Sequence, residues 1–186
     1  MASLIYVTNA SLDGFIEDAH GVFDWGQPDD ELSAAYTAML SSVGTLLYGR
    51  RLYESMAVWE TDPAFAEESD LNADFARAWQ AADKVVYSTT LTTVPTAATR
   101  LEHHFEPSAV RALKAGTTSD LTIGGANIAA RAFEAGLVDE CQLFVWPTIV
   151  GGGKPAFSEG VRADLALVDE HRFGNGVVRL RYRVST

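Results

Sequence analysis

The sequence predicts an α/β domain whose mainly parallel sheet ends in an antiparallel hairpin. Segments of strand and helix character alternate as far as Thr148, which is the pattern of parallel strands joined by helices. Two β-prone segments, Leu165–Arg172 and Val177–Val184, then flank the turn sequence Gly174-Asn175-Gly176. The 186 residues show no internal repeat, low-complexity tract or linker, so we expect one domain, 1–186, with a sizeable core.

Composition and charge narrow the class of protein. The net charge of −11 argues against a protein that binds nucleic acid, which needs a basic face. The single cysteine, Cys141, excludes an internal disulfide, and the adjacent His103 and His104 have no matching third ligand, so no metal site is predicted. The N-terminus resembles no targeting peptide, and no run approaches the ~18 apolar residues of a membrane helix. We therefore expect a cytoplasmic protein without membrane or nucleic-acid partners.

The first strand is expected at Leu4 to Thr8, which is apolar and β-prone. Asp13, in the Asp-Gly turn sequence that follows, is either a turn residue or a carboxylate at the mouth of a cleft. Two aromatic rings, Phe23 and Trp25, lie in the loop Gly21–Pro28. They either cap the core or form the wall of a pocket for a flat heterocycle.

A helix is expected to begin near Asp29, because Asp29, Asp30 and Glu31 suit the positive end of a helix. Its buried stripe consists of Leu32, Ala35, Tyr36, Met39 and Leu40.

The second strand, Thr45–Tyr48, is followed at once by Gly49, Arg50, Arg51 and a helix that extends to about Ala57. Two cations at a helix N-terminus oppose the helix dipole, at a cost of a few tenths to about 1 kcal/mol each. Their position is explained if an anion lies between them. The alternative is two solvated arginines that point away from the axis.

A helical region is expected over Pro63–Ala82, before a third strand at Lys84–Tyr87. The hydroxyls of Ser88-Thr89-Thr90 then either bind phosphate or ribose oxygens or cap the turn. Leu91–Glu106 is polar and predicted to be irregular, and Pro107 is expected to begin a helix that ends at Gly116.

The fourth strand, Leu121–Ile123, leads through Gly124-Gly125 into a helix at Ala126–Ala135. Such a turn leaves backbone N–H groups free at the positive end of a helix, where a phosphate can bind; the alternative is a plain tight turn. The last parallel strand is expected at Cys141–Thr148, before the glycine-rich loop Val150–Phe157.

Three of these strand ends carry groups suited to anions, and the ends of parallel strands share one edge of a sheet. An extended ligand with several phosphates, such as a dinucleotide, would satisfy all three. The glycine fingerprint G-x-G-x-x-G is absent, and the arginines favour a 2′-phosphate, and so NADPH over NADH. With a dinucleotide bound, the predicted reaction is hydride transfer to a small-molecule heterocycle.

Several short motifs occur in the order seen in dihydrofolate-reductase-like proteins. They are Ser11-Leu12-Asp13-Gly14, Leu47-Tyr48-Gly49-Arg50, Val85-Val86-Tyr87-Ser88 and Ile123-Gly124-Gly125. More narrowly, Pro147–Gly153 and Pro155–Phe157 resemble the late loop of the riboflavin-pathway reductase domain, the C-terminal domain of the bifunctional deaminase-reductase. The resemblance covers nearly the whole chain. It implies a three-layer dihydrofolate-reductase-like fold, an NADPH-dependent reductase and a homodimer.

The resemblance also implies roles for individual residues. The phosphates would be held by Gly49, Arg50 and Arg51, with Ser88 and Thr89 near the 2′-phosphate. The pyrophosphate cradle would consist of Gly124, Gly125, Ala126, Asn127 and Ile128. On the substrate side, Asp13 is expected to polarise or protonate the substrate and Asp30 to contact it, with Glu31 as the alternative to Asp30. From its place in the aromatic loop, and not from the resemblance, Trp25 is also expected to contact the substrate.

The substrate remains open at this point. Phe15 follows the Asp-Gly pair, where the riboflavin-type motif commonly has a polar or basic residue, and this weakens the case for a ribose-phosphate substrate. The best single expectation is a reductase similar to that acting on 5-amino-6-(5-phosphoribosylamino)uracil. The alternatives are a pterin reductase and a non-catalytic NADPH-binding protein of the same fold.

Overall fold

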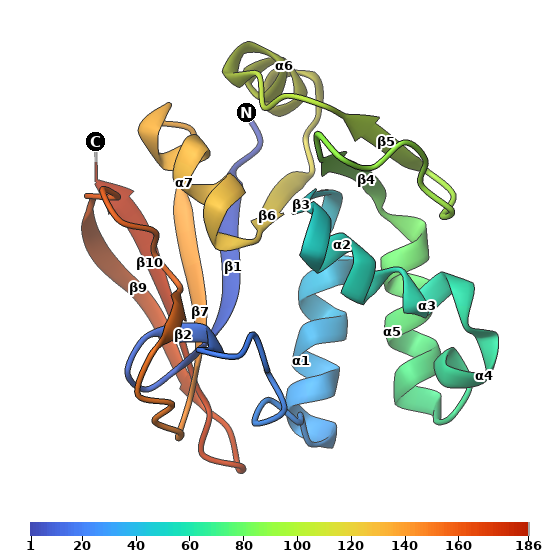
Figure 1. Cartoon of the computed structure of the whole chain (residues 1–186), viewed down its shortest axis with the longest axis vertical. Coiled ribbons are helices and arrows are strands. Elements are labelled where there is room, and N and C mark those ends of the chain that lie inside the picture. The colour runs from blue at the N-terminus through green and yellow to red at the C-terminus, as the bar shows by residue number, and fades with distance from the viewer. Residues whose placement is uncertain (186) are drawn as a thin grey trace.

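An eight-stranded sheet organises the computed structural model, which describes residues 1–185 (Figure 1). The strands lie in the order β5-β4-β3-β6-β1-β7-β10-β9. The first six strands of this order run parallel to one another, β10 runs antiparallel to β7, and β9 runs antiparallel to β10. Their bounds are β1 Leu4–Ser11, β3 Val43–Gly49, β4 Asp83–Tyr87, β5 Thr99–Glu102, β6 Asp120–Gly124, β7 Glu140–Trp146, β9 Asp164–Arg172 and β10 Val178–Ser185. The predicted α/β class, with a mainly parallel sheet and a C-terminal hairpin, is confirmed.

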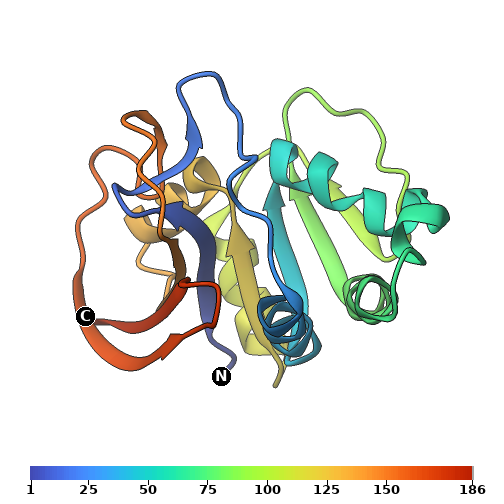
Figure 2. The same cartoon turned by 90° about the horizontal axis from the view of Figure 1, so that it is seen from below.

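Helices cover both faces of the sheet and make three layers. On one face lie α1 Asp30–Ser41 and α5 Asp70–Ala81, and on the other α6 Pro107–Gly116 and α7 Ala126–Glu134. Figure 2 shows α1 and α5 nearly end-on along the same side of the sheet. Three short helices connect β3 to α5: α2 Arg50–Met56, α3 Val58–Thr61 and α4 Pro63–Ala66.

Because both faces are covered, the central strands bury consecutive residues on opposite sides. The core on the α1 and α5 side includes Leu40, Leu46, Tyr48, Trp79 and Val86. The core on the α6 and α7 side includes Leu47, Val85, Val110, Ile123 and Ile128. This double burial explains why the central strands are near-continuous apolar runs in the sequence.

Three strands were not predicted. β5 lies within the segment Leu91–Glu106, which was expected to be irregular; it is polar because it forms the edge of the sheet and is only partly buried. β2 Phe15–Asp18 and β8 Gly153–Pro155 pair with each other in a separate two-stranded sheet. Their pairing joins segments more than a hundred residues apart, so neither segment shows it alone.

The helical region predicted for Pro63–Ala82 is divided into α4 and α5. The Ser69 hydroxyl accepts a hydrogen bond from the Asn72 backbone N–H at 3.1 Å and so caps α5 at its start. A serine cap marks the start of a new helix. The prediction of one continuous helical region was therefore wrong.

The strands β1 and β6 separate inside the sheet. Their pairing ends at Tyr6 and Ile123, whereas β1 continues to Ser11, and within the described chain Val7–Ser11 pairs with β7 alone. We call the open side of Val7–Ser11 the seam. The chain leaving β1 passes through α1 on one face, and the chain leaving β6 passes through α7 on the other, so the seam is a topological switch point, where open α/β sheets bind ligands.

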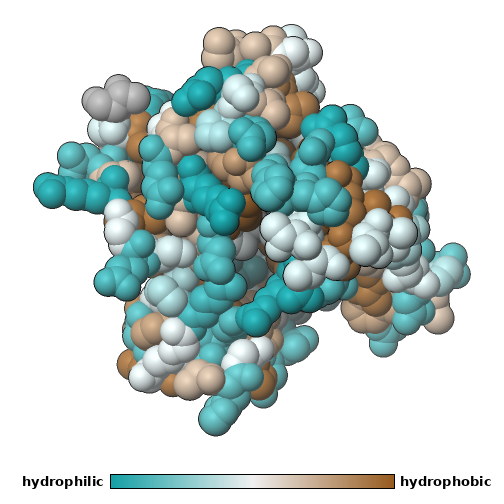
Figure 3. Space-filling view, turned by 45° about the horizontal axis from the view of Figure 1, so that its top comes forward, coloured by the Kyte–Doolittle hydropathy of each residue, from teal (hydrophilic) through white to brown (hydrophobic). Residues whose placement is uncertain are grey.

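The surface is polar over much of its area. Figure 3 shows hydrophilic residues spread over one face of the molecule, with apolar residues interspersed among them. Across residues 1–185, we find no helix with both the length and the apolar character needed to cross a bilayer.

Candidate active site

Two glycine turns meet at the carboxyl edge of the sheet. Gly49 ends β3 and precedes α2, and Gly125 follows β6 and precedes α7 with a φ of +99°. A Cβ atom on Gly125 would lie 3.8 Å from the Gly49 backbone nitrogen, and one on Gly124 would lie 2.3 Å from Cδ2 of Leu52. The backbones of the two turns therefore lie close together, with the side chains of Leu52 and Ile128 packed against them.

The first turn of α7 has backbone N–H groups available for an anion. No side chain caps α7 at Gly125, and its first backbone hydrogen bond runs from the Ala129 N–H to the Gly125 carbonyl. The N–H groups of Ala126, Asn127 and Ile128 thus lie at the positive helix end beside Gly49, which is the arrangement that binds phosphate. The predicted cradle residues are together, and they fit the pyrophosphate of a dinucleotide.

Arg50 and Arg51 are each paired with a carboxylate. Arg50 Nη1 lies 3.1 Å from both carboxylate oxygens of Glu54, one turn along α2, and Arg51 Nη1 lies 3.4 Å from Glu17 of β2. The two arginine side chains are 42% and 71% exposed, so these ion pairs contribute only about 0–1 kcal/mol. Either arginine can therefore exchange its partner for a phosphate at little cost.

The turn after β4 is held together by Ser88. The Ser88 hydroxyl accepts hydrogen bonds from the backbone N–H groups of Thr90 at 3.2 Å and Leu91 at 3.0 Å, so it caps its own turn. Thr89 is exposed. His103 Nδ1 lies 2.9 Å from the Ser88 carbonyl, which adds an imidazole that the sequence did not assign to this edge. His103 directly follows β5, so its place at this edge could be predicted only by predicting β5 beside β4.

Asp13 connects the turn after β1 to the Val150–Gly151 loop. Its carboxylate accepts hydrogen bonds from the Ser11 hydroxyl at 2.7 Å and from the backbone N–H groups of Gly151 at 2.8 Å and Val150 at 3.2 Å. These contacts, Ser11 foremost, lower the pKa of Asp13. An ionised carboxylate with these partners is a poor proton donor, so of the two roles expected for Asp13, polarisation of the substrate is favoured.

The charge of Asp13 should contribute to acid-dependent stability. A carboxyl group with a lowered pKa stabilises the fold above its ordinary value of 3.8 and loses this effect as pH falls through the lowered pKa. The difference in unfolding free energy between wild type and Asp13→Asn should thus be constant near neutral pH and shrink below 3.8, as measured by denaturant unfolding at a series of pH values. The control is Asp24→Asn, an exposed carboxylate in the loop before α1. A difference that does not vary with pH would contradict the prediction.

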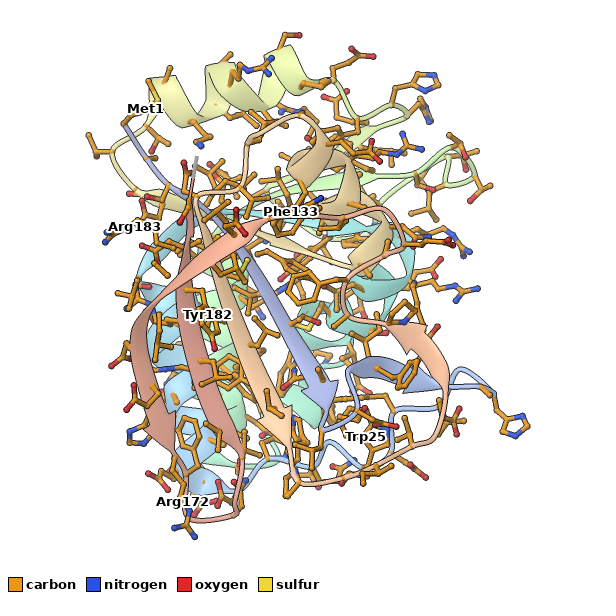
Figure 4. The ribbon with its side chains drawn as sticks, turned by 90° about the vertical axis from the view of Figure 1, so that its left-hand side faces the viewer. Met1, Trp25, Phe133, Arg172, Tyr182 and Arg183 are labelled. Atoms are coloured by element: carbon orange, nitrogen blue, oxygen red, sulfur yellow. The ribbon has the colours of Figure 1, made fainter. Side chains whose placement is uncertain are left out.

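Trp25 lies just beyond the carboxyl end of β1, where Figure 4 shows it beside the arrowhead of the strand. Its ring meets those of Phe23 and Trp146 edge-to-face, with centroids 4.4 Å and 6.3 Å apart. The indole nitrogen of Trp25 is buried, and no group of residues 1–185 accepts a hydrogen bond from it.

Three acidic residues surround the start of α1, and two of them are engaged. Asp29 caps the helix by accepting from the Leu32 N–H at 3.0 Å. Glu31 accepts from the Gly174 N–H at 2.8 Å and lies 3.5 Å from His171. The exposed Asp30 carboxylate has no hydrogen bond or ion pair within residues 1–185, so of Asp30 and Glu31 it is Asp30 that is available to a ligand.

A polar cluster beside the seam was not predicted. The side-chain oxygen of Asn9 accepts from the Tyr36 hydroxyl at 2.5 Å and from the Trp146 indole N–H at 2.9 Å. Tyr36 was assigned only to the buried stripe of α1, and Asn9 lies just past the expected end of the first strand. In the described chain, no group of three or more His, Cys, Asp or Glu side chains is arranged to hold a metal ion.

Two comparisons of the sequence with known proteins identify relatives that match most of the chain. The family model of the RibD C-terminal domain matches residues 2–179. The uncharacterized protein YyaP of Bacillus subtilis (strain 168) is 30% identical over 174 residues, which are 92% of this chain and 89% of that protein.

Solved structures agree on the fold. A putative riboflavin biosynthesis protein from Shewanella sp. PV-4 has a TM-score of 0.77 at 21% identity, with 99% of both chains covered. The deaminase/5-amino-6-(5-phosphoribosylamino)uracil reductase of Thermotoga maritima has a TM-score of 0.65 at 17% identity, covering 99% of this chain and 57% of that one. Dihydrofolate reductase from Enterococcus faecalis, complexed with NADP(H) and RAB-propyl, has a TM-score of 0.65 at 11% identity, covering 99% and 97%.

The predicted dihydrofolate-reductase-like fold is thereby confirmed. The family match covers nearly the whole chain and includes both glycine turns and the seam. The chain belongs to the RibD C-terminal domain family.

Proposed function

We propose that the chain is an NADPH-dependent reductase that transfers hydride to a nitrogen heterocycle, with an aminopyrimidine of the 5-amino-6-(5-phosphoribosylamino)uracil type as the best substrate candidate. The observation that carries the proposal is the uncapped start of α7 at Gly125 close to the Gly49 turn, beside two weakly paired arginines and next to the seam. The family membership and the activity printed for the Thermotoga maritima relative support the substrate class.

The cofactor and the substrate would bind on opposite sides of the seam. On one side, the α7 N-terminus and the Gly49 turn would hold the pyrophosphate, and Arg50 or Arg51 would turn from its carboxylate to the 2′-phosphate. On the other side, Trp25 and Asp30 would hold the flat ring. The chemistry that NADPH supplies when bound is hydride donation. Asp13, fixed by three hydrogen bonds to Ser11, Val150 and Gly151, would stay ionised and polarise the substrate.

The first test of the proposal is direct. Titration with NADPH should quench tryptophan fluorescence, because Trp25 and Trp146 lie close to the end of β1. Failure to bind at millimolar cofactor would overturn the proposal. Binding without oxidation of NADPH by any heterocycle tested would instead indicate a cofactor-binding protein that lacks the chemistry.

Arg50→Ala should separate the two cofactors. Loss of one charge-assisted contact to the 2′-phosphate should raise the Kd for NADPH by about 10- to 100-fold, while the Kd for NADH, which lacks that phosphate, changes by less than about threefold. Isothermal titration with both cofactors measures this. Arg77→Ala is the matched control, because Arg77 is an exposed helical arginine paired with Asp74 on α5. Equal losses for NADPH and NADH would remove Arg50 from the 2′-phosphate site.

A pterin is the second substrate candidate, and Asp30 is the observation that favours it. An available carboxylate at the start of α1 can accept hydrogen bonds from the amino group and ring N–H of a pterin. Turnover assays with dihydrofolate and with the aminopyrimidine distinguish the two candidates.

A further inference from the structure

The Asn9 side chain has a fixed orientation. An asparagine amide can usually be placed with oxygen and nitrogen exchanged, so its direction depends on its neighbours. Here the Trp146 indole N–H can only donate, and it lies 2.9 Å from the Asn9 oxygen. The Tyr36 hydroxyl, 2.5 Å from the same oxygen, therefore donates as well. Because both contacts use the oxygen, the NH₂ group of Asn9 must point the other way.

The partners that set this orientation are themselves held in place. Trp146 is 5% exposed, and the Tyr36 ring packs edge-to-face on Phe144 with centroids 4.7 Å apart. Burial raises the pKa of the Tyr36 phenol, which keeps the hydroxyl protonated and donating. The amide is thus a preorganised group on a rigid strand.

The free NH₂ group belongs to a residue beside the seam, where we propose that the substrate binds. Asn9 belongs to the part of β1 that borders the seam, on the sheet face covered by α1, and it is partly exposed. The Asn9 NH₂ donates to no group within residues 1–185, so it is available to a ligand. The buried Trp25 indole N–H, whose ring packs on Trp146, is also without an acceptor there.

We infer that Asn9 is a specificity-determining residue, whose NH₂ group donates to a carbonyl oxygen of the bound ring and selects carbonyl-bearing over amino-bearing heterocycles. The inference rests on the proposed function, which it narrows. If the ligand had an amino group at the same point, two hydrogen-bond donors would face each other. The Asn9 NH₂ and the ligand amino group would then both be desolvated without an acceptor. A mismatch of this kind weakens binding by about 10- to 100-fold.

Two pyrimidines test the inference because they share the amino groups at C5 and C6 and carry acceptors in one case and donors in the other at C2 and C4, with the ring nitrogens changed accordingly. 5,6-Diaminouracil has carbonyl oxygens at C2 and C4, and 2,4,5,6-tetraaminopyrimidine has amino groups there. Each is titrated into the full-length protein, with and without NADP⁺, and Kd is read from tryptophan fluorescence. The wild type should bind diaminouracil at least about tenfold more tightly.

Asn9→Asp is the decisive variant. It keeps an oxygen for Trp146 and Tyr36, replaces the NH₂ donor by an acceptor and adds a negative charge. It should shift the ratio of the two affinities by about 100-fold toward tetraaminopyrimidine, without changing the Kd for NADP⁺. Gln80→Glu, the same amide-to-carboxylate change on the exposed side of α5, should leave the ratio unchanged. Asn9→Leu, which removes the donor without adding a charge, should abolish the preference without reversing it, and thermal melting shows that each variant is folded.

Each outcome has a defined meaning. A ratio within twofold of wild type in Asn9→Asp, a wild-type preference for tetraaminopyrimidine, or binding of neither pyrimidine would overturn the role of Asn9. Failure to bind NADP⁺ would overturn the proposed function instead. The titrations without cofactor would still report the pyrimidine preference, so the two failures are distinguishable.

Discussion

Gly125→Ala should lower the affinity for NADPH by about 100-fold or more. The φ of +99° at Gly125 is a conformation that a side chain adopts only at a cost of about 1–3 kcal/mol, and the added Cβ would lie beside the Gly49 backbone, where the cofactor phosphates are expected. The added methyl group would exclude the phosphates, and the strained turn would displace the N-terminus of α7. Both effects lower the affinity for NADPH. Isothermal titration of NADPH measures the loss.

Gly136→Ala separates backbone strain from the loss of the cradle. Gly136 follows α7 at its other end, has a φ of +63°, and has open space where a Cβ would be added. Both variants should lose stability, by about 1–2 kcal/mol in the case of Gly136, but only Gly125→Ala should lose NADPH. Similar cofactor affinities in the two variants would show that the Gly124-Gly125 turn is only a connection between strand and helix.

Trp79→Ala should lower the free energy of unfolding by about 3–5 kcal/mol, the range for truncation of a large buried aromatic side chain. Trp79 is fully buried, and its indole N–H donates to the Tyr48 hydroxyl at 3.2 Å. Its ring also lies 4.4 Å from the ammonium of Lys84, which otherwise contacts only backbone carbonyls at the end of α5. The alanine variant would leave a cavity and remove the aromatic partner of a buried cation. Denaturant unfolding followed by circular dichroism gives the value.

Trp59→Ala provides the comparison, because Trp59 is only partly buried and packs against Phe65 and Phe75 near the surface. It should lose clearly less stability than Trp79→Ala. Trp79→Phe should recover part of the packing but not the hydrogen bond to Tyr48. If both alanine variants lost the same stability, the core on the α1 and α5 side would not be centred on Trp79.

The long buried elements were predictable because each shows its burial in its own residues. The strands at Leu47, Val85 and Ile123 are apolar runs with glycines or hydroxyls at their ends, and this local pattern was sufficient to place the three turns on one edge. That Gly49 lies beside Gly125 depends in addition on β3 and β6 being neighbours in the sheet, which the sequence did not predict.

The features that were not predicted depend on contacts between distant segments. β2 and β8 form only against each other, and the carboxylate of Asp13 reaches a loop 137 residues away. Asn9 is an unremarkable strand residue until Tyr36 and Trp146 meet at its oxygen. Periodicity and turn sequences describe neighbours along the chain, whereas these sites are made by neighbours in space. The homodimer and the cytoplasmic location stay predictions.

The seam also has a consequence for how this protein can diverge. Along Val7–Ser11 the open side of the strand has no ladder partner within residues 1–185, and it presents peptide groups, which every amino acid except proline carries alike. Mutation can therefore exchange the side chains on the two faces of β1 while the polar outline of the strand persists. Under the proposed function, a single substitution at a position such as Asn9 would change the heterocycle that is accepted and leave the cofactor site unaltered.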